Sequence, residues 1–101
     1  MDLGLAGRIA IITGCSVGIG RTIAQVLASE GAQTVVVARR AALLASLQDE
    51  IVAAAGLRPH AMAFDLADQR VPQLIADEVM ARFGQIDILV NNAGGSRPTT
   101  I

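Results

Sequence analysis

The fold of this chain is indicated first by residues 8–20, which read Arg8-Ile9-Ala10-Ile11-Ile12-Thr13-Gly14-Cys15-Ser16-Val17-Gly18-Ile19-Gly20. The first half of this stretch is a short apolar run rich in β-branched residues, which suits a parallel strand covered on both faces. Three glycines follow within seven residues: Gly14, Gly18 and Gly20. Behind them, apolar residues recur at helical spacing: Ile19, Ile23, Val26 and Leu27. A glycine turn that leads into a helix favours phosphate binding, because the backbone can approach the anion and the first-turn N–H groups have no partner within the helix.

The rest of the chain alternates between strand patterns and helix patterns. We predict strands at residues 8–13, 34–38, 60–64 and 86–90. We predict helices at residues 19–30, 41–55 and 68–83. Asp68 is the expected N-cap of the third helix, although Pro72 fits that start poorly.

This βαβαβαβ order predicts the α/β class, with a doubly wound parallel sheet in the strand order 3-2-1-4. Right-handed crossovers place the first two helices on one face of the sheet and the third on the other. Ligands are then expected beyond the carboxyl ends of the first and fourth strands, where the glycine turn lies.

Composition narrows the class of protein. The chain has 101 residues, of which 52% are hydrophobic, and a formal net charge of -1. This balance argues against disorder and gives no reason to expect a nucleic-acid partner. One cysteine fits a reducing compartment, the N-terminus lacks a secretory signal pattern, and no apolar run reaches the roughly 18 residues of a membrane span. We therefore expect a cytoplasmic protein without a membrane partner.

The glycine spacing resembles that of the short-chain dehydrogenase/reductase family, whose cofactor loop reads T-G-x-x-x-G-I-G, as residues 13–20 do here. Two further family motifs follow in order, at residues 65–66 and 91–94. The resemblance covers essentially the whole chain. It implies that residues 1–101 are a single Rossmann-type NAD(P)-binding domain, incomplete at the C-terminus. In the complete enzyme it implies hydride transfer between a nicotinamide and a small carbonyl or alcohol substrate, and a homo-oligomer.

The phosphate turn contributes the first set of expected cofactor contacts: Gly14, Gly18 and Gly20. The hydroxyl of Ser16 can donate to a phosphate, and the backbone of Ile19 can lie along the pyrophosphate. Ile19 fits equally well as the first core residue of the helix.

The other strand ends supply the second set. By resemblance, Asp65 holds the adenine amino group with the backbone of Leu66 beside it, whereas the residue pattern alone also fits a turn aspartate. The resemblance assigns the lining of the adenosine ribose to Asn92, Ala93 and Gly94. Asn91 is expected to brace the sheet, with Thr13 bonded to that same segment.

The residues after the second strand favour NADP over NAD. An acid there would accept hydrogen bonds from the ribose hydroxyls and favour NAD. Here Ala38 is followed by Arg39, whose guanidinium can clamp a 2′-phosphate, and in the family an arginine at this place implies NADP. Val17 stands where such family members often carry a second basic residue, which weakens the NADP assignment and keeps NAD as the alternative.

The residues of the family's catalytic step are absent from this sequence. The chain has no tyrosine, and all eight of its basic residues are arginines, whereas the family's general acid/base is a tyrosine supported by a lysine. We therefore assign no catalytic residue and no metal ligand, and expect the cofactor-binding part of a longer reductase. The alternatives are a non-catalytic nucleotide-binding or partner-binding module, and an inactive remnant.

The expected surface follows from the same reading. His60 has no partner for metal or triad chemistry and should be structural or exposed, and Glu78 should be solvated. The fourth strand should form an apolar sheet edge, with side chains of the first and fourth strands uncovered. We therefore expect the isolated chain to be aggregation-prone, to self-associate through the fourth strand, or to be only partly ordered.

Overall fold

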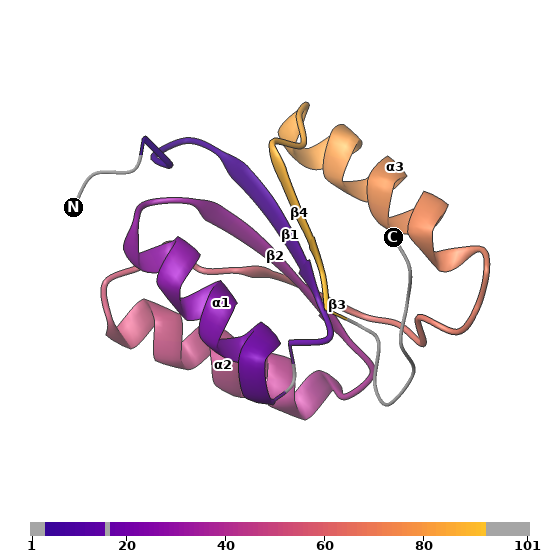
Figure 1. The fold of residues 1–101 in the computed structure, drawn as a ribbon, viewed down its shortest axis with the longest axis horizontal. Helices are drawn as coiled ribbons and strands as arrows, with labels where there is room; N and C mark the ends of the chain where they lie inside the picture. Colours follow the sequence, from indigo (N-terminus) through magenta and orange to yellow (C-terminus); the bar gives the residue numbers. More distant parts are fainter. Residues whose placement is uncertain (1–3, 16, 93–101) are drawn as a thin grey trace.

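The computed structural model describes residues 4–15 and 17–92, and these form a parallel sheet with helices on both faces (Figure 1). The elements along the chain are β1 (Ile9–Thr13), α1 (Gly18–Ser29), β2 (Gln33–Ala38), α2 (Ala41–Ala53), β3 (His60–Ala63), α3 (Val71–Phe83) and β4 (Ile88–Asn91). The strand order is β3-β2-β1-β4, and every pairing is parallel. The predicted fold class and strand order are therefore confirmed. Within the described residues, no helix has the length and apolar character needed to cross a bilayer.

The core lies in two layers, one on each face of the sheet. All five residues of β1 are buried, as are the last five of β2. Alternate side chains of these strands pack against α1 and α2 on one face and against α3 on the other, as predicted (Figure 1). The central strands are thus covered on both sides, which is why they read as continuous apolar runs.

Small residues form the fully buried centre of the α1 face that packs on the sheet. They are Gly20, Ala24 and Ala28, spaced one turn apart. Of the apolar residues that recur at helical spacing, Ile23 and Leu27 pack against this core and are partly buried, whereas Ile19 and Val26 are 71% and 52% exposed. The short side chains allow the helix backbone to lie close to β1 and β2.

The start of α3 differs from the prediction. Asp68 does not cap the helix: its carboxylate accepts the N–H of Arg70 at 2.9 Å and pairs with the same arginine's guanidinium at 2.8 Å. This turn precedes the helix, which begins at Val71 with Pro72 in its first turn. Proline is tolerated there because the first-turn N–H groups have no intrahelical partner. The proline therefore moves the start of the helix past Asp68.

The outer strand β4 is held at its beginning by Asp87. The Asp87 carboxylate accepts the N–H of Ile9 at 2.8 Å, and the Asp87 N–H donates to the carbonyl of Ile9 at 2.9 Å. Leu89 in β4 is 66% exposed. The expectation of uncovered side chains is thus correct for β4 and wrong for β1, because the helices on both faces reach over β1.

Candidate functional site

The carboxyl ends of all four strands lie at the same end of the sheet. In the register of the sheet, Thr13 lies beside Val37 on one side and beside Asn91 on the other. Ala38 in turn lies beside Ala63. The segments that follow these residues are the glycine turn, the arginine pair at 39–40, the turn at 65–66 and Asn92. The topology therefore brings these four segments together at the carboxyl ends of the strands.

Two glycines of the turn are required by backbone conformation. Gly14 has a φ of +68° and Gly18 a φ of +69°, in the left-handed region that glycine adopts without steric cost. The N–H of Gly14 donates to the carbonyl of Val37 at 2.8 Å, which ties the turn to the end of β2. A Cβ on Gly18 would meet nothing within 4 Å, so this part of the turn faces open space.

Gly20 is required for a different reason, which is lack of space. A Cβ at this position would overlap the carbonyl oxygen of Gly14 and lie 2.7 Å from the side-chain nitrogen of Asn92. That nitrogen also faces the Gly14 carbonyl at 3.4 Å. The first turn of α1, the glycine turn and the end of β4 are therefore in direct contact, and only a glycine at residue 20 permits it.

Thr13 fastens the end of β4 to the end of β1. Its buried hydroxyl donates to the side-chain oxygen of Asn91 at 3.1 Å and accepts the N–H of Asn92 at 3.1 Å. The expected bond between Thr13 and this segment is confirmed. Asn91 braces the sheet through the same contact, so the backbone that follows β4 leaves the sheet in a defined direction.

The N-terminus of α1 has no capping side chain among the described residues. Its N-cap is Val17, and none of these side chains caps the helix by a hydrogen bond. The first turn contains no acidic side chain, so the described part of the chain supplies no carboxylate or hydroxyl partner to its N–H groups and to the positive end of the helix dipole. The exposed side chain of Ile19 excludes the alternative that it serves as a core residue.

The remaining predicted contacts lie on the neighbouring strand ends. Arg39 is exposed directly after β2, and its side chain makes no hydrogen bond or ion pair with any residue that the structure describes. Asp65 is exposed after β3, and one of its carboxylate oxygens accepts the N–H of Ala67 at 3.0 Å. Leu66 packs against the core layer beneath α3. Ser16, Ala93 and Gly94 lie outside the described residues.

Cys15 is part of the core and does not line the site. Its side chain is fully buried, and its thiol lies 3.3 Å from the carbonyl oxygen of Ile12 and 3.4 Å from that of Val37. Burial raises the pKa of the Cys15 thiol to about 11, although the hydrogen bond with Val37 and the charge of Arg21 act in the opposite direction. A thiol with this pKa is protonated at neutral pH and unreactive.

Sequence reasoning missed the contacts of Arg21, which joins α1 to α2. Its guanidinium donates to the carbonyl of Leu43 at 3.0 Å, to the hydroxyl of Ser46 at 3.0 Å and to the carboxylate of Glu50 at 2.9 Å. The side chain is only 17% exposed. The available signal was weak: Ser46 and Glu50 lie one turn apart on α2, so they share a face and can converge on one cation.

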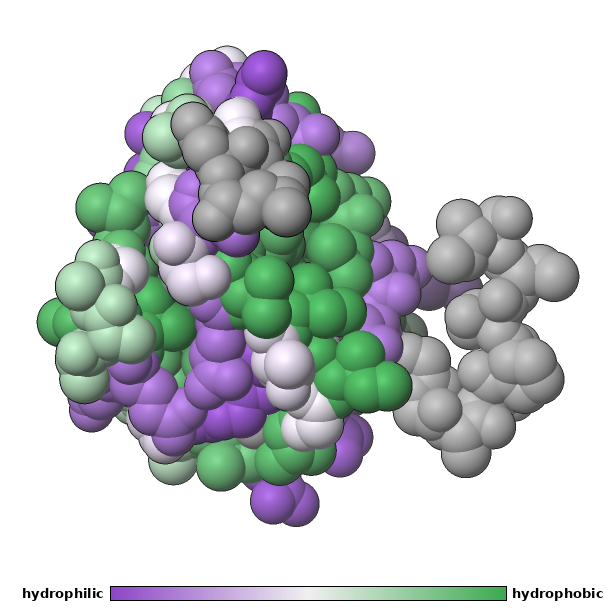
Figure 2. Space-filling view, turned by 60° about the vertical axis from the view of Figure 1, so that its left-hand side comes forward, coloured by the Kyte–Doolittle hydropathy of each residue, from purple (hydrophilic) through white to green (hydrophobic). Residues whose placement is uncertain are grey.

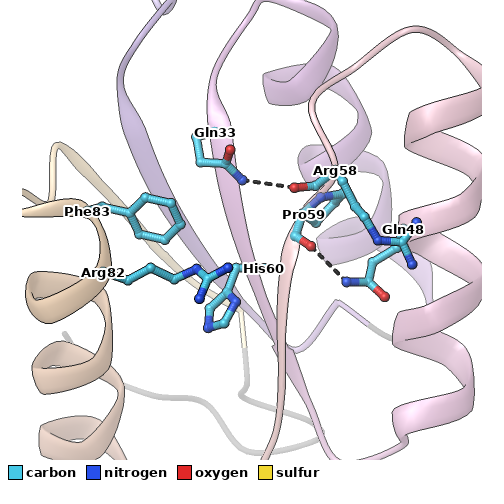
Figure 3. Close-up of a pocket in the computed structure, with 7 residues that line it drawn as sticks. All are labelled: Gln33, Gln48, Arg58, Pro59, His60, Arg82 and Phe83. Atoms are coloured by element: carbon cyan, nitrogen blue, oxygen red, sulfur yellow. Dashed lines mark hydrogen bonds between the residues drawn. The ribbon is translucent and has the colours of Figure 1, made fainter.

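A hollow of about 280 Å³ lies at the other end of the sheet, where the strands begin (Figure 3). Its lining includes the start of β2, the start of β3 and the end of α3. Gln33 and Gln48 donate to the backbone carbonyls of Arg58 and Pro59 there, at 3.0 Å and 2.7 Å. His60 in this hollow pairs with Glu78 at 3.2 Å, so Glu78 is not simply solvated as expected. These contacts hold the start of β3, an outer strand, in place at the end of the sheet away from the glycine turn.

Comparison with known proteins identifies the architecture. The family model described as short chain dehydrogenase matches residues 8–101. D-threitol dehydrogenase from Mycolicibacterium smegmatis is 40% identical over 96 residues, which cover 95% of this chain and 36% of that protein.

Two solved structures show the same fold. A metagenomic short-chain oxidoreductase in complex with NADP is 43% identical with a TM-score of 0.84, covering 89% of this chain and 40% of that one. L-Sorbose reductase from Gluconobacter frateurii, complexed with NADPH and L-sorbose, is 40% identical with a TM-score of 0.88, covering 100% of this chain and 38% of that one. The chain thus spans less than half the length of each of these three proteins.

Proposed function

The chain belongs to the short-chain dehydrogenase family, and on that premise we propose that it binds NADP(H) as the cofactor-binding part of an oxidoreductase. The observation that carries the proposal is the close contact of Gly20 with Gly14 and Asn92. An ordinary turn before a helix does not require a glycine packed against the residues that follow β1 and β4. A turn that presents its backbone N–H groups to a pyrophosphate does, because the start of the helix must lie close against the turn and the sheet.

Each residue at the carboxyl ends of the strands has a proposed role in binding the cofactor. Gly14, Gly18 and the backbone of Ile19 would hold the pyrophosphate at the N-terminus of α1, with the hydroxyl of Ser16 as an additional donor. On the adenosine side, Asp65 would accept a hydrogen bond from the adenine amino group through the carboxylate oxygen that does not hold Ala67. The backbone of Leu66 would lie beside the adenine, and the adenosine ribose would lie along Asn92, Ala93 and Gly94.

We assign the preference for NADP to Arg39. Its exposed guanidinium follows β2, whose end is tied to the glycine turn through the Gly14–Val37 hydrogen bond. A 2′-phosphate at this place would receive charge-assisted hydrogen bonds. The two solved relatives described above contain NADP and NADPH, which supports the same choice.

The complete enzyme would transfer a hydride between the nicotinamide and a carbonyl or alcohol carbon. Part of that work lies outside this chain, which has no tyrosine and no lysine to act as proton donor. Within the chain, the described residues bind and orient the nucleotide half of the cofactor and supply no proton. A cytoplasmic location and a homo-oligomer of the complete enzyme remain proposals as well, the first resting on the single cysteine.

The test is calorimetric titration of the chain with NADP⁺ and NAD⁺. NADP⁺ should bind about tenfold to a hundredfold more tightly, which corresponds to one charged contact of about 1.5–3 kcal/mol. Arg39→Asp should reverse that order, because a carboxylate repels the 2′-phosphate and accepts from the ribose hydroxyls of NAD⁺.

Arg58→Asp is the matched control, since it makes the same charge change at the opposite edge of the sheet. It should leave the NADP⁺ preference intact. Equal affinities for the two nucleotides in the unaltered chain would overturn the assignment of Arg39. A failure of both nucleotides to bind would overturn the proposed function of the chain.

A further inference from the structure

Three hydrogen bonds from the Arg21 side chain to described residues reach the same helix. One guanidinium nitrogen donates to the carbonyl of Leu43, in the first turn of α2. The other donates to Ser46 and Glu50, on the following turns. Glu50 also accepts the side-chain N–H of Gln25 at 2.8 Å, so a second residue of α1 joins the same carboxylate. One planar cation thus spans two turns of α2, which a guanidinium can do because its donors are fixed in a fork.

The position of Arg21 in the chain links this contact to the candidate site. It directly follows Gly20, which is fixed against Gly14 and Asn92. Its charge also acts on the thiol of Cys15 within the glycine turn. The base of the Arg21 side chain is therefore anchored at the phosphate turn, while its head group is anchored on α2.

The first turn of α2 is held in the core by the buried side chain of Leu44, but its polar groups have few side-chain partners. Its N-cap is Arg40, and within the described residues no side chain caps the helix by a hydrogen bond. Arg39 and Arg40 are both exposed. The contact of Arg21 with the Leu43 carbonyl lies four residues after Arg39, so it acts on the first turn that follows the proposed 2′-phosphate contact.

We propose that Arg21 is a positioning residue for cofactor selection, which holds the start of α2, and with it Arg39, at a set distance from the glycine turn. The proposal rests on the proposed function, in which Arg39 contacts the 2′-phosphate. NAD lacks that phosphate, so a shift of Arg39 weakens binding of NADP and leaves binding of NAD unaffected. Any disturbance of the glycine turn itself affects both nucleotides alike. The ratio of the two affinities therefore isolates the positioning effect from general damage.

The variants are Arg21→Met and Arg21→Lys, with Arg58→Met as the matched control. Arg58 also pairs with an acid of α2, at 3.6 Å from Asp49, but at the opposite edge. Affinities for NADPH and NADH are measured by fluorescence titration of the full chain. Arg21→Met should reduce the preference for NADPH about tenfold, the factor that corresponds to one lost charge-assisted hydrogen bond. Arg58→Met should leave the preference unchanged.

Arg21→Lys separates position from charge. A lysine keeps the positive charge but lacks the fork that spans the three acceptors. The proposal requires Arg21→Lys to behave like Arg21→Met. A preference restored by lysine would show that the charge alone matters, and a preference unchanged in Arg21→Met would show that Arg21 has no part in selection. Either result overturns the proposal.

Amide hydrogen exchange of the nucleotide-free chain provides a readout that needs no cofactor. The amides of residues 43–47, whose N–H groups are hydrogen-bonded in the first turns of α2, should exchange about tenfold faster in Arg21→Met than in the unaltered chain, while residues of β1 exchange as before. Unchanged exchange at residues 43–47 overturns the proposal even if nucleotide binding changes. If neither nucleotide binds the unaltered chain, the proposed function fails, and the selection role of Arg21 fails with it, whatever the exchange shows.

Discussion

The glycines of the turn show that one residue type can serve two physical purposes. Gly14 and Gly18 supply a left-handed backbone, whereas Gly20 supplies space beside a carbonyl and an amide. The sequence predicted all three as site residues, from their spacing and from the two family motifs that accompany them. It could not separate their roles, because the crowding at Gly20 arises from the Gly14 carbonyl and from Asn92, and both contacts exist only in the folded chain.

Alanine substitutions should separate the two purposes. Gly18→Ala places a side chain in open space at a φ of +69°, and should reduce the free energy of unfolding by about 1–2 kcal/mol. Gly20→Ala places a Cβ against backbone that cannot move without breaking the strand ends apart, and should cost about 3 kcal/mol. Urea unfolding measures both values.

Gly84→Ala is the control for backbone strain, because Gly84 ends α3 at a φ of +77° with nothing within 4 Å of its Cβ. It should cost about as much as Gly18→Ala. A smaller loss for Gly20→Ala than for Gly18→Ala would contradict the explanation by crowding.

The boundaries of the helices and strands depended on contacts that local patterns do not contain. Helix and strand types were predicted correctly throughout, since buried strands and helical spacing are local properties of the sequence. The packed face of α1 was predicted only in part, at Ile23 and Leu27, because its fully buried residues, Gly20, Ala24 and Ala28, carry little hydrophobic signal. Asp68 was wrongly placed at the start of α3 because its partner, Arg70, could compete for its carboxylate. The packed face of α1 and the start of α3 therefore depend on packing and on competing side-chain hydrogen bonds, which local propensity does not describe.

The attachment of β4 to β1 should depend on pH. The hydrogen bond from the N–H of Ile9, together with contacts from Gln85 and Arg8, lowers the pKa of Asp87, although partial desolvation acts in the opposite direction. A carboxylate whose pKa is lowered by folding stabilises the fold fully above its unfolded pKa of about 3.9. That contribution is lost as the pH falls through the lower, folded value.

Asp87→Asn should therefore be less stable than the unaltered chain at neutral pH, and the difference should shrink as the pH falls below about 4. An asparagine still accepts the N–H of Ile9 but carries no charge at any pH. Urea unfolding at a series of pH values measures the gap. A gap that stays constant down to the acid limit of folding would show that the charge of Asp87 contributes nothing to stability.

The molecule as a whole presents a sheet edge and a broad hydrophobic surface. Figure 2 shows hydrophobic side chains gathered in the middle of one face, with smaller groups at its left side and along the bottom. The exposed large hydrophobic residues include Ile19, Val26, Leu74, Met80 and Leu89. The strand order could be predicted because crossover handedness restricts the topology. The extent of exposed surface could be predicted only for β4, since the coverage of β1 depends on where the helices lie.

The chain should self-associate through β4. Among the described residues no strand pairs with its outer side, which leaves N–H and C=O groups for another strand, and Leu89 adds an exposed apolar side chain. Leu89→Lys should shift the population towards monomer, because a lysine on an edge strand opposes pairing with another strand. Size-exclusion chromatography with light scattering, across a range of concentrations, follows the change.

Leu57→Lys is the control, since Leu57 is also about half exposed but precedes β3 on the far side of the sheet. It should leave the association unchanged. A chain that is a uniform monomer at every concentration would contradict self-association through β4. An equal shift towards monomer in both variants would place the contact between chains elsewhere.

Binding of the dinucleotide at the carboxyl ends of the strands can be observed directly by a two-dimensional ¹⁵N NMR titration of the chain with NADP⁺. We expect the amide signals of Gly14, Gly18, Arg39, Asp65 and Asn92 to shift together, with a single saturating dependence on ligand concentration. Signals that remain unchanged at saturating NADP⁺, or shifts confined to the opposite hollow at Gln33, Gln48 and Arg82, would contradict it.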